Sequence, residues 1–144
     1  MVSIRAKTHA DVPALFDIWR RAVIATHHFL SAADFAEIEA LVRDIYLPAA
    51  ELWVAADESA PPVGFIGLSG AHIDALFVAP NAHGRGVGRR LVEHARGMPR
   101  PLSVDVNEQN EGALAFYRRL GFRVSGRSPT DDQGRPYPLL HLRL

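Results

Sequence analysis

Hydrophobic residues in the first third of the chain recur at the spacing of α-helices. After a short strand pattern at residues 2–6, two segments with this spacing begin near Asp11 and Ser31, residue types favoured at helix N-caps. The apolar positions are Val12, Leu15, Phe16, Trp19 and Val23 in the first segment, and Phe35, Ile38, Leu41, Val42 and Ile45 in the second. The pattern predicts a helical hairpin, with Pro13 in the first turn of one helix and Pro48 just past the end of the other.

From residue 52 onward, strand patterns alternate with two further helices. Apolar, β-branched and aromatic runs predict strands at residues 52–56, 63–68, 73–78 and 101–106, and a closing hairpin from residues 122–126 and 137–142. Helical spacing recurs at Val87, Leu91 and Ala95, and again between Asn110 and Leu120, where Gly121 ends the helix. Adjacent strands followed by strand–helix–strand units indicate an α/β fold (α+β with a mixed sheet), mostly antiparallel, with helices on both faces.

Composition narrows the class of protein. A length of 144 residues predicts one domain spanning residues 1–144. Sixteen basic and sixteen acidic side chains cancel, so no overall charge favours nucleic acid or an anionic membrane as a partner. The absence of cysteine excludes a disulfide scaffold, a thiolate metal site and a cysteine nucleophile. With no leader pattern and no apolar stretch of about 20 residues, we expect a cytoplasmic protein.

The glycine-rich segment at residues 83–88 predicts a phosphate site. It lies between a strand that ends at Pro80 and the helix that follows. Alternating glycines let several backbone N–H groups converge, and the N-terminus of a helix adds its positive end. Arg85, Arg89 and Arg90 bring full positive charges nearby. The dinucleotide fingerprint would need glycine in place of Arg89, and the Gly-Lys-Ser/Thr of a Walker A loop is absent.

Two linked motifs resemble the GNAT superfamily of acetyl-CoA-dependent N-acetyltransferases. Leu76-Phe77-Val78-Ala79-Pro80, followed after three residues by Gly84-Arg85-Gly86-Val87-Gly88, is similar to the coenzyme A loop of that family, which reads Gln/Arg-x-x-Gly-x-Gly/Ala. Asn107-Glu108-Gln109-Asn110, followed by Ala113, Phe116-Tyr117, Leu120 and Gly121-Phe122, is similar to the family's segment between its fifth strand and fourth helix. His83 occupies the family's Gln/Arg position, and we expect weaker or pH-sensitive coenzyme binding, not its loss.

The resemblance implies a GNAT-like sheet that splays between its fourth and fifth strands and holds acetyl-CoA there, without a metal. The pantetheine arm would follow the backbone of the fourth strand, where an N–H near Phe77 or Val78 would hold the thioester carbonyl. The residues expected to bind the coenzyme are Leu76, Phe77, Val78, His83, Gly84, Arg85, Gly86, Val87, Gly88, Arg89, Asn110 and Tyr117. Tyr117 is the expected general acid, since a phenol can protonate the departing thiolate. Its helical pattern alone favours a tyrosine at the edge of the core, and the paired motif reverses that preference.

Asp74 is the first candidate for the general base. Strict alternation along the strand would place it on the same face as His72, Leu76 and Val78. A structural ion pair between Asp74 and a histidine is the competing interpretation. His72 and Glu108 are the alternative bases.

The acceptor is expected to bind near the junction at residues 25–30 and the loop at residues 128–137. The candidate contacts are Trp19, His27, Phe29, His72 and Tyr137. The alternative is that Trp19 and Phe29 belong to the core. His27 and His28 lack the partners of a metal motif, and Asp131 to Gly134 has the pattern of a hairpin turn more than that of a calcium loop.

The expected activity is direct transfer of an acetyl group from acetyl-CoA to a primary amine in a ternary complex. The acceptor could be a small-molecule amine or an amine of a peptide or protein. The alternatives are a non-catalytic acyl-CoA sensor and a transferase of a longer acyl group. A monomer and a homodimer both stay open, because the terminal strand at residues 139–144 could be a sheet edge or an interior strand.

Overall fold

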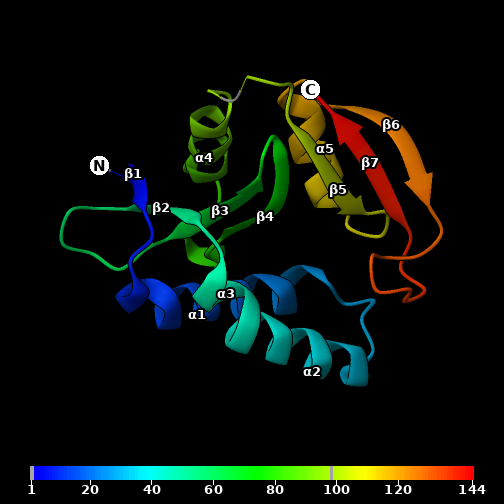
Figure 1. The fold of residues 1–144 in the computed structure, drawn as a ribbon, viewed down its shortest axis with the longest axis horizontal. Coiled ribbons are helices and arrows are strands. Elements are labelled where there is room, and N and C mark those ends of the chain that lie inside the picture. The colour runs from blue at the N-terminus through cyan, green and yellow to red at the C-terminus, as the bar shows by residue number, and fades with distance from the viewer. Residues whose placement is uncertain (1, 98) are drawn as a thin grey trace.

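The computed structural model describes residues 2–97 and 99–144, which form one sheet of seven strands with helices on both faces (Figure 1). The strands are β1 (Ser3–Ala6), β2 (Leu52–Ala56), β3 (Gly64–Ser69), β4 (His72–Val78), β5 (Ser103–Asn107), β6 (Arg123–Ser128) and β7 (Leu139–Arg143). Their order in the sheet is β1-β2-β3-β4-β5-β7-β6. Only β4 and β5 pair in parallel, which confirms the mixed, mostly antiparallel sheet expected from the sequence.

The helices divide the core into two apolar clusters. The longer helices are α1 (Val12–Thr26), α2 (Ala32–Leu41), α4 (Val87–Ala95) and α5 (Glu111–Arg119), and the short elements are η1 (His9–Asp11), η2 (Val42–Tyr46), α3 (Leu47–Ala49) and η3 (Pro80–Ala82). Residues of α4 and α5 pack on one face of the sheet, whereas α1 and α3 pack on the other face (Figure 1). The second cluster includes no residue of β5, β6 or β7 within the described ranges, so this half of the sheet lacks an apolar layer there.

The sheet splits between β4 and β5, as the sequence predicts. The two strands pair only at His72–Ser103 and Ile73–Val104 and then diverge. We call the diverging region beyond Ile73 and Val104 the fork. From there on, β4 pairs with β3 along one edge only. On its other edge His83 bonds to the Val78 carbonyl, and the N–H groups of Leu76 and Val78 have no partner strand within the described residues and can pair with a ligand.

A β-bulge at Asp74 breaks the alternation of side chains along β4. Ala75 pairs with Gly67 and Ile73 with Leu68, so Asp74 is the extra residue. Consequently Ile73 packs in the α4–α5 cluster and Ala75 in the α1–α3 cluster. The prediction that Asp74 shares a face with Leu76 and Val78 by strict alternation is wrong for this reason.

The second helix of the hairpin continues further than predicted. Ser31 caps α2, its hydroxyl accepting a hydrogen bond from the N–H of Asp34 at 3.1 Å. The helix then widens into the π-helical turn η2 and passes into α3, which contains Pro48. Proline lacks an N–H and its ring crowds the preceding turn, and a widened turn accommodates both effects. Pro48 therefore lies within the helix and not past its end.

The start of α1 also differs from the sequence prediction. Asp11 does not cap α1 with its side chain; Thr8 instead begins the preceding turn, and the Asp11 carboxylate accepts a hydrogen bond from the Thr8 N–H at 2.8 Å.

At the other end of the chain, β7 lies between β5 and β6, so the terminal strand is interior. Within the described residues, no helix has the length and apolar character needed to cross a bilayer.

Candidate active site

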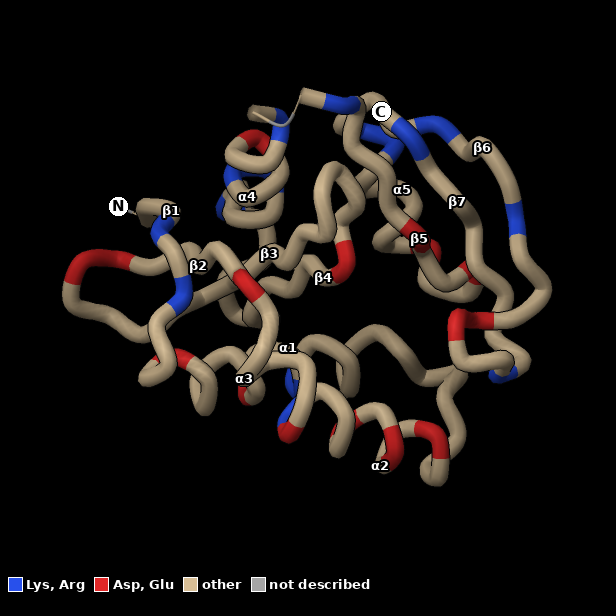
Figure 2. The backbone as a smooth tube through the Cα atoms, viewed as in Figure 1, with Lys and Arg blue, Asp and Glu red and all other residues tan. Residues whose placement is uncertain are grey.

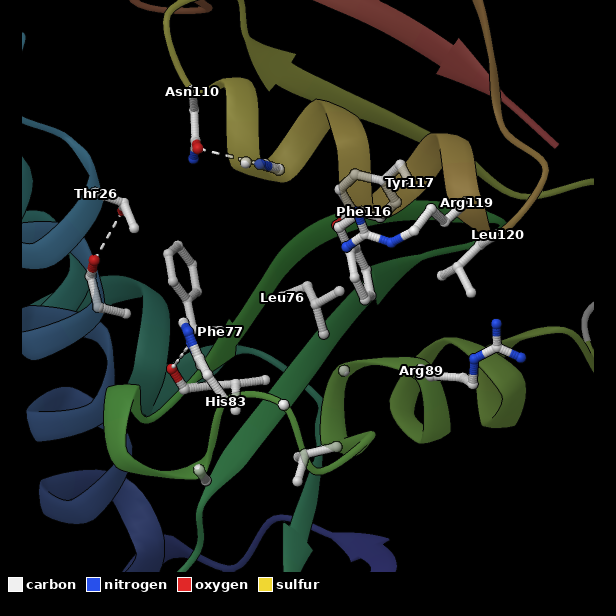
Figure 3. Close-up of a pocket in the computed structure, with 18 of the residues that line it drawn as sticks. Thr26, Leu76, Phe77, His83, Arg89, Asn110, Phe116, Tyr117, Arg119 and Leu120 are labelled. Carbon is white, nitrogen blue, oxygen red and sulfur yellow. Dashed lines mark hydrogen bonds between the residues drawn. The ribbon is translucent and has the colours of Figure 1, made fainter.

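A pocket of about 590 Å³ occupies the fork and is lined by residues from helices on both faces of the sheet. It joins the end of β4, the loop before α4, the exposed side of α5 and the C-terminal turn of α1 (Figure 3). Its lining residues are Ala22, Thr26, His27, Leu76, Phe77, Val78, Ala82, His83, Gly84, Gly86, Val87, Gly88, Arg89, Asn110, Gly112, Ala113, Phe116, Tyr117, Arg119 and Leu120. Eleven of the twelve residues expected to bind the coenzyme line this pocket, and Arg85 does not.

The loop before α4 presents backbone N–H groups to the pocket. Gly84 and Gly86 have φ angles of +79° and +76°, in the left-handed region that residues with a Cβ rarely adopt. Gly86 is the N-cap of α4, which begins at Val87. The first N–H groups of a helix have no partner within it, and the helix dipole favours an anion there. The expectation that this loop binds phosphate stays a prediction, and its backbone conformation is compatible with it.

Gly88 has a packing role in addition to its place in the loop motif. A Cβ at this position would lie 3.1 Å from Cζ of Phe116, closer than ordinary van der Waals contact. The missing side chain therefore allows α4 and α5 to approach each other through Phe116. Because Gly88 and Phe116 both line the pocket, their contact forms the part of its wall where α4 meets α5.

His83 turns back onto the strand that precedes it. Its Nε2–H donates a hydrogen bond to the carbonyl oxygen of Val78 at 3.1 Å (Figure 3). The Ala79 N–H donates to the carbonyl of Val63, which precedes β3. Successive N–H groups of a strand point to opposite edges, so those of Leu76 and Val78 point away from β3 and toward the fork. The His83 contact is consistent with that direction, because it occupies the Val78 carbonyl from the fork side.

Tyr117 is a buried tyrosine of α5 that borders the pocket. Its residue is 6% exposed, and its ring packs edge-on against Phe116 and Phe122. Burial raises the pKa of the phenol far above its ordinary value, because the charged form loses its hydration. Tyr117 therefore keeps its proton at neutral pH and can donate it. The same contacts make it part of the core, as its helical pattern indicates, and its role as general acid stays a prediction.

Asn110 caps α5 at the pocket wall. Its Oδ1 accepts a hydrogen bond from the N–H of Ala113 at 3.2 Å (Figure 3). This confirms the capping role expected from the sequence. The side-chain NH₂ of Asn110 retains its capacity to donate to a ligand.

Sequence reasoning missed two groups of pocket residues. The first is Arg119 and Leu120 at the end of α5, where Figure 3 shows Arg119 and Arg89 on opposite sides of the pocket. Neither guanidinium forms a salt bridge with the residues that the structure describes. Helical spacing could have indicated Arg119, because it follows Phe116 by three residues and therefore lies on the same side of the helix. The second is Ala22 of α1, which becomes part of the pocket only through the tertiary fold, whereas Thr26 falls in the predicted junction at residues 25–30.

His27 places a neutral imidazole against the α1 side of the pocket. Burial and, to a smaller degree, the neighbouring His28 lower the pKa of His27 to about 4. The Thr26 hydroxyl donates to the carbonyl of Ala22 at 2.8 Å, so it must accept from Nδ1–H of neutral His27, 2.7 Å away. The Nε2 atom of His27 is thus a hydrogen-bond acceptor.

The candidate bases differ in accessibility. Asp74 does not line the pocket; its carboxylate accepts a hydrogen bond from Ser69 and lies near Tyr46, on the α3 side of the sheet. Glu108 is held by Arg127, with 2.6 Å between Oε2 and Nε, and this guanidinium lowers the pKa of the carboxyl. Both features make Glu108 a poorer proton acceptor.

The remaining acceptor candidates separate into core and loop residues. Trp19 is 4% exposed and stacks with Phe16 and Phe35, so it belongs to the core, and its expected contact with the acceptor is not supported. Phe29 packs against the ring of Tyr137, whose centroid is 5.8 Å away. His72 lies outside the pocket lining, at the start of β4.

Tyr137 and Arg135 attach the loop between β6 and β7 to the beginning of α2. The Tyr137 hydroxyl donates to the Asp34 carboxylate and accepts from the N–H of Ser31 at 3.2 Å. Arg135 is 14% exposed and lies among three carboxylates, of which Glu37 is nearest at 3.2 Å. Figure 2 shows acidic positions along α2 and on the loop that faces it. We call the contacts of Tyr137 and Arg135 with residues 31–37 the loop clasp.

Metal-ligating side chains do not gather in this part of the molecule. Across residues 2–97 and 99–144, no group of three or more histidine, cysteine, aspartate or glutamate side chains has an arrangement that could hold a metal ion. The pocket instead combines a helix N-terminus, free strand N–H groups and two guanidiniums.

Comparison with known proteins gives consistent matches over nearly the whole chain. The profile of the acetyltransferase (GNAT) domain matches residues 23–137. The chain is 55% identical over 142 residues to the peptidyl-lysine N-acetyltransferase YjaB of Escherichia coli, covering 99% of this chain and 96% of that protein. It is 32% identical to the peptidyl-lysine N-acetyltransferase YiaC of Escherichia coli, covering 84% and 83%. The solution structure of apo-form YjaB from Escherichia coli superimposes with a TM-score of 0.93, covering 99% of this chain and 97% of that one.

Proposed function

This chain belongs to the GNAT family of acetyltransferases, and from this premise we propose that it acetylates the ε-amino group of lysine in peptides or proteins. As a member of the family it is an N-acetyltransferase that uses acetyl-CoA as its acetyl donor. The observation that carries the choice of lysine is the 55% identity, over almost the full length of both chains, with a peptidyl-lysine N-acetyltransferase.

The pocket residues fit the anionic and polar parts of the donor. The N–H groups around Gly86 suit a pyrophosphate, because they combine unpaired donors with the positive end of α4. Arg89 and Arg119 add two positive charges that no described carboxylate neutralises. The free edge of β4 at Leu76 and Val78 offers the backbone pairing that an amide-containing arm needs. Bound acetyl-CoA supplies the thioester carbonyl that the acceptor amine attacks.

The chain's own groups support direct transfer. The chain has no cysteine, so a cysteine-bound acetyl group is not available as an intermediate. The Val78 N–H, which faces the fork, is the candidate donor to the developing oxyanion, and one such donor is worth roughly 3 kcal/mol in comparable sites. Tyr117 holds its proton and borders the pocket, so it is the candidate for protonating the leaving thiolate.

An access route for a peptide is open on the side of the sheet that faces α1. The pocket includes Thr26 and His27 on that side, and the part-exposed side chains of Ser103, Asp105 and His141 make the neighbouring face of β5 and β7 polar. A lysine side chain is long and thin, so it could enter the fork while its peptide stays on this surface. The donor and acceptor would then approach the reacting centre from opposite faces.

The test uses peptides that contain a single lysine and have a blocked N-terminus. We expect release of coenzyme A and a mass increase of one acetyl group that maps to the lysine. A matched peptide with arginine in place of lysine should give neither signal. Acetylation of an unblocked α-amine but not of lysine would contradict the assignment of lysine as the acceptor. It would still agree with N-acetyltransferase activity. Tight donor binding without acetylation of any peptide or small-molecule amine would favour the acyl-CoA sensor.

A further inference from the structure

A cluster of five polar side chains lies just beyond the pocket, on the open face of β5 and its neighbours. At its centre is Asp105 of β5, whose carboxylate lies between His72 of β4 and His141 of β7. The outer nitrogen of each imidazole meets a hydroxyl. His72 Nδ1 is 2.8 Å from Ser103 Oγ, and His141 Nε2 is 2.6 Å from Ser128 Oγ. We call these five residues the Asp105 cluster.

The two imidazoles contact the carboxylate differently. His141 Nδ1 is 2.5 Å from Oδ1 of Asp105, so this nitrogen must carry a proton and donate it. His72 Nε2 is 3.7 Å from Oδ2 of the same carboxylate, which is beyond hydrogen-bond distance. One side of Asp105 is thus occupied by a hydrogen bond. On the other side, Oδ2 and Nε2 of His72 are close enough for one donor, placed beside the two atoms, to reach hydrogen-bond distance of both.

The cluster lies at the closed end of the fork. His72 and Ser103 form the first of the two residue pairs that join β4 and β5, and Asp105 is the first residue of β5 beyond the last pair. The phosphate loop lies at the opposite end, past Val78. A donor held at that loop and extended along β4 would point its acyl end toward the Asp105 cluster.

The cluster is accessible from solvent. The side chain of Asp105 is 25% exposed, and both imidazoles are about one third exposed, at 36% for His72 and 35% for His141. The other charged groups on this face are Asp74 of β4, Arg143 of β7, paired with Ser103, and Arg123 of β6, paired with Arg143. None of these three forms an ion pair with the cluster within the described residues.

We propose that the Asp105 cluster binds the acceptor's ammonium group and that His72 takes its proton. This inference rests on the proposed acetylation of lysine. The ammonium donates one hydrogen bond to Oδ2 of Asp105 and one to Nε2 of His72, bridging the two atoms from the solvent side. One N–H bond of the ammonium then breaks and an Nε2–H bond forms, which leaves a neutral amine with a lone pair and an imidazolium beside a carboxylate.

The chemistry requires such a group. A lysine ammonium has a pKa near 10.4, so at neutral pH the acceptor arrives protonated and cannot attack. An imidazole that gains a proton next to a carboxylate is stabilised by the opposite charge. The scheme uses the tautomer in which Nδ1–H of His72 donates to the Ser103 hydroxyl, because that tautomer leaves the Nε2 lone pair for the substrate. His141 does not touch the acceptor in this scheme; it is a positioning residue that holds Asp105 through Oδ1.

The test compares wild-type protein with H72Q and D105N, using Asp17→Asn, an exposed carboxyl of α1 that does not line the pocket, as the control. Each protein is assayed from pH 6 to 10 with a lysine peptide and with the same peptide carrying an aminooxy group, which is already neutral. We expect kcat/KM for lysine to fall about 100-fold at pH 7 in H72Q, and the deficit to shrink as the pH rises. With the aminooxy peptide the deficit should be much smaller, and the calorimetric affinity for acetyl-CoA should be unchanged.

His141 is tested through its role as a hydrogen-bond donor. H141L should shift the pH midpoint of kcat/KM upward, and H141N, whose amide can still donate to Asp105, should restore it. Equal losses for both acceptors at every pH would overturn the proposal in favour of a structural cluster. Unchanged activity of H72Q and D105N would also overturn it. Failure of the wild-type protein to acetylate any lysine peptide would instead overturn the proposed function, and this inference with it.

Discussion

The hydroxyl of Tyr46 lies against the backbone of Gly67, so that no side chain fits at position 67. A Cβ there would overlap the phenol oxygen and lie 2.8 Å from Cδ2 of Leu52. The hydroxyl has no hydrogen-bond partner within the described residues, and burial together with the charge of Asp74 raises the pKa of Tyr46 to about 12. Two irregular elements, the π-helical turn η2 and the bulge of β4, therefore meet at this contact.

We predict that Gly67→Ala lowers the free energy of unfolding by about 1–3 kcal/mol, the usual cost of overpacking. The double variant with Tyr46→Phe should recover part of that loss, because the ring carbon Cζ would be 3.5 Å from the new Cβ, an ordinary contact. Urea denaturation of both single variants and the double variant gives the coupling energy.

The control for this cycle is Gly112→Ala on α5. A Cβ there would lie 3.8 Å from Oδ1 of Asn110, so nothing must move. Alanine has the higher helix propensity, and this variant should be neutral or slightly more stable. If Gly67→Ala leaves the free energy of unfolding unchanged, the turn η2 that carries Tyr46 must move away from β3 without loss of stability.

Regular periodicity explains why most of the fold is predictable and why two of its details are not. Helical and alternating patterns locate every long helix and every strand within a few residues of the observed bounds. The bulge at Asp74 and the turn before Pro48 interrupt those periods. Neither leaves a local signal, because a bulge depends on the register of the partner strand and a π-turn on the packing around it.

The same contrast applies to the candidate active site. The glycines of the phosphate loop are recognisable because left-handed backbone requires them, and Gly84 and Gly86 have that conformation. The Asp105 cluster is not recognisable, since Asp105 and His141 are 36 residues apart in sequence. Their proximity depends on β7 entering the sheet beside β5, which a strand pattern alone does not specify.

Tyr117→Phe should reduce kcat about 100-fold and leave the affinity for acetyl-CoA nearly unchanged. The phenylalanine ring keeps the edge-on contacts with Phe116 and Phe122 and removes only the proton donor. Steady-state kinetics together with calorimetric titration separate the two effects. Tyr46→Phe, which removes a buried hydroxyl from a tyrosine outside the pocket, is the matched control and should retain full turnover. Normal turnover of Tyr117→Phe would exclude it as the general acid.

Arg119→Ala should weaken binding of acetyl-CoA by about tenfold or more, as expected for the loss of one hydrogen bond to a charged group. Arg119 lines the pocket opposite Arg89 and is positioned to contact an anionic part of the coenzyme (Figure 3). Titration with coenzyme A and with dephospho-CoA would identify which phosphate it contacts. Arg118→Ala changes the neighbouring residue, which does not line this pocket, and should leave both affinities unchanged. Equal behaviour of the two variants would show that Arg119 makes no contact.

The Arg5–Asp11 pair predicts a pH-dependent contribution to stability. Asp11 is buried and accepts hydrogen bonds from Arg5 at 2.8 and 3.0 Å, and Arg5 is the main reason that the pKa of Asp11 falls to about 2. Because this value lies below the ordinary 3.8, the folded protein binds fewer protons than the unfolded chain. The contribution is therefore complete above about pH 4 and is lost as the pH falls toward 2.

Asp11→Asn should lower the free energy of unfolding by about 1–2 kcal/mol at pH 7, after allowance for the partial exposure of Arg5. Below pH 3 the two proteins should converge. Asp17→Asn is the control, since Asp17 forms an exposed i,i+4 pair with Arg21 that is worth about 0.5 kcal/mol or less. A constant difference between wild type and Asp11→Asn from pH 2 to 7 would contradict an electrostatic origin.

Tyr137→Phe should loosen the loop clasp and weaken peptide binding without changing the donor site. The Tyr137 hydroxyl joins the loop between β6 and β7 to Ser31 and Asp34 at the start of α2, and it is distant in sequence from both. Loss of this part-buried hydrogen bond removes a charge-assisted contact that holds the loop against α2, so the loop should open more often. We expect faster hydrogen exchange at residues 129–138, a higher KM for a lysine peptide and an unchanged affinity for acetyl-CoA. Asp132→Asn, in the same loop but outside these contacts, should change none of the three. A higher exchange rate with an unaltered KM would show that the loop clasp stabilises the fold but takes no part in holding the acceptor.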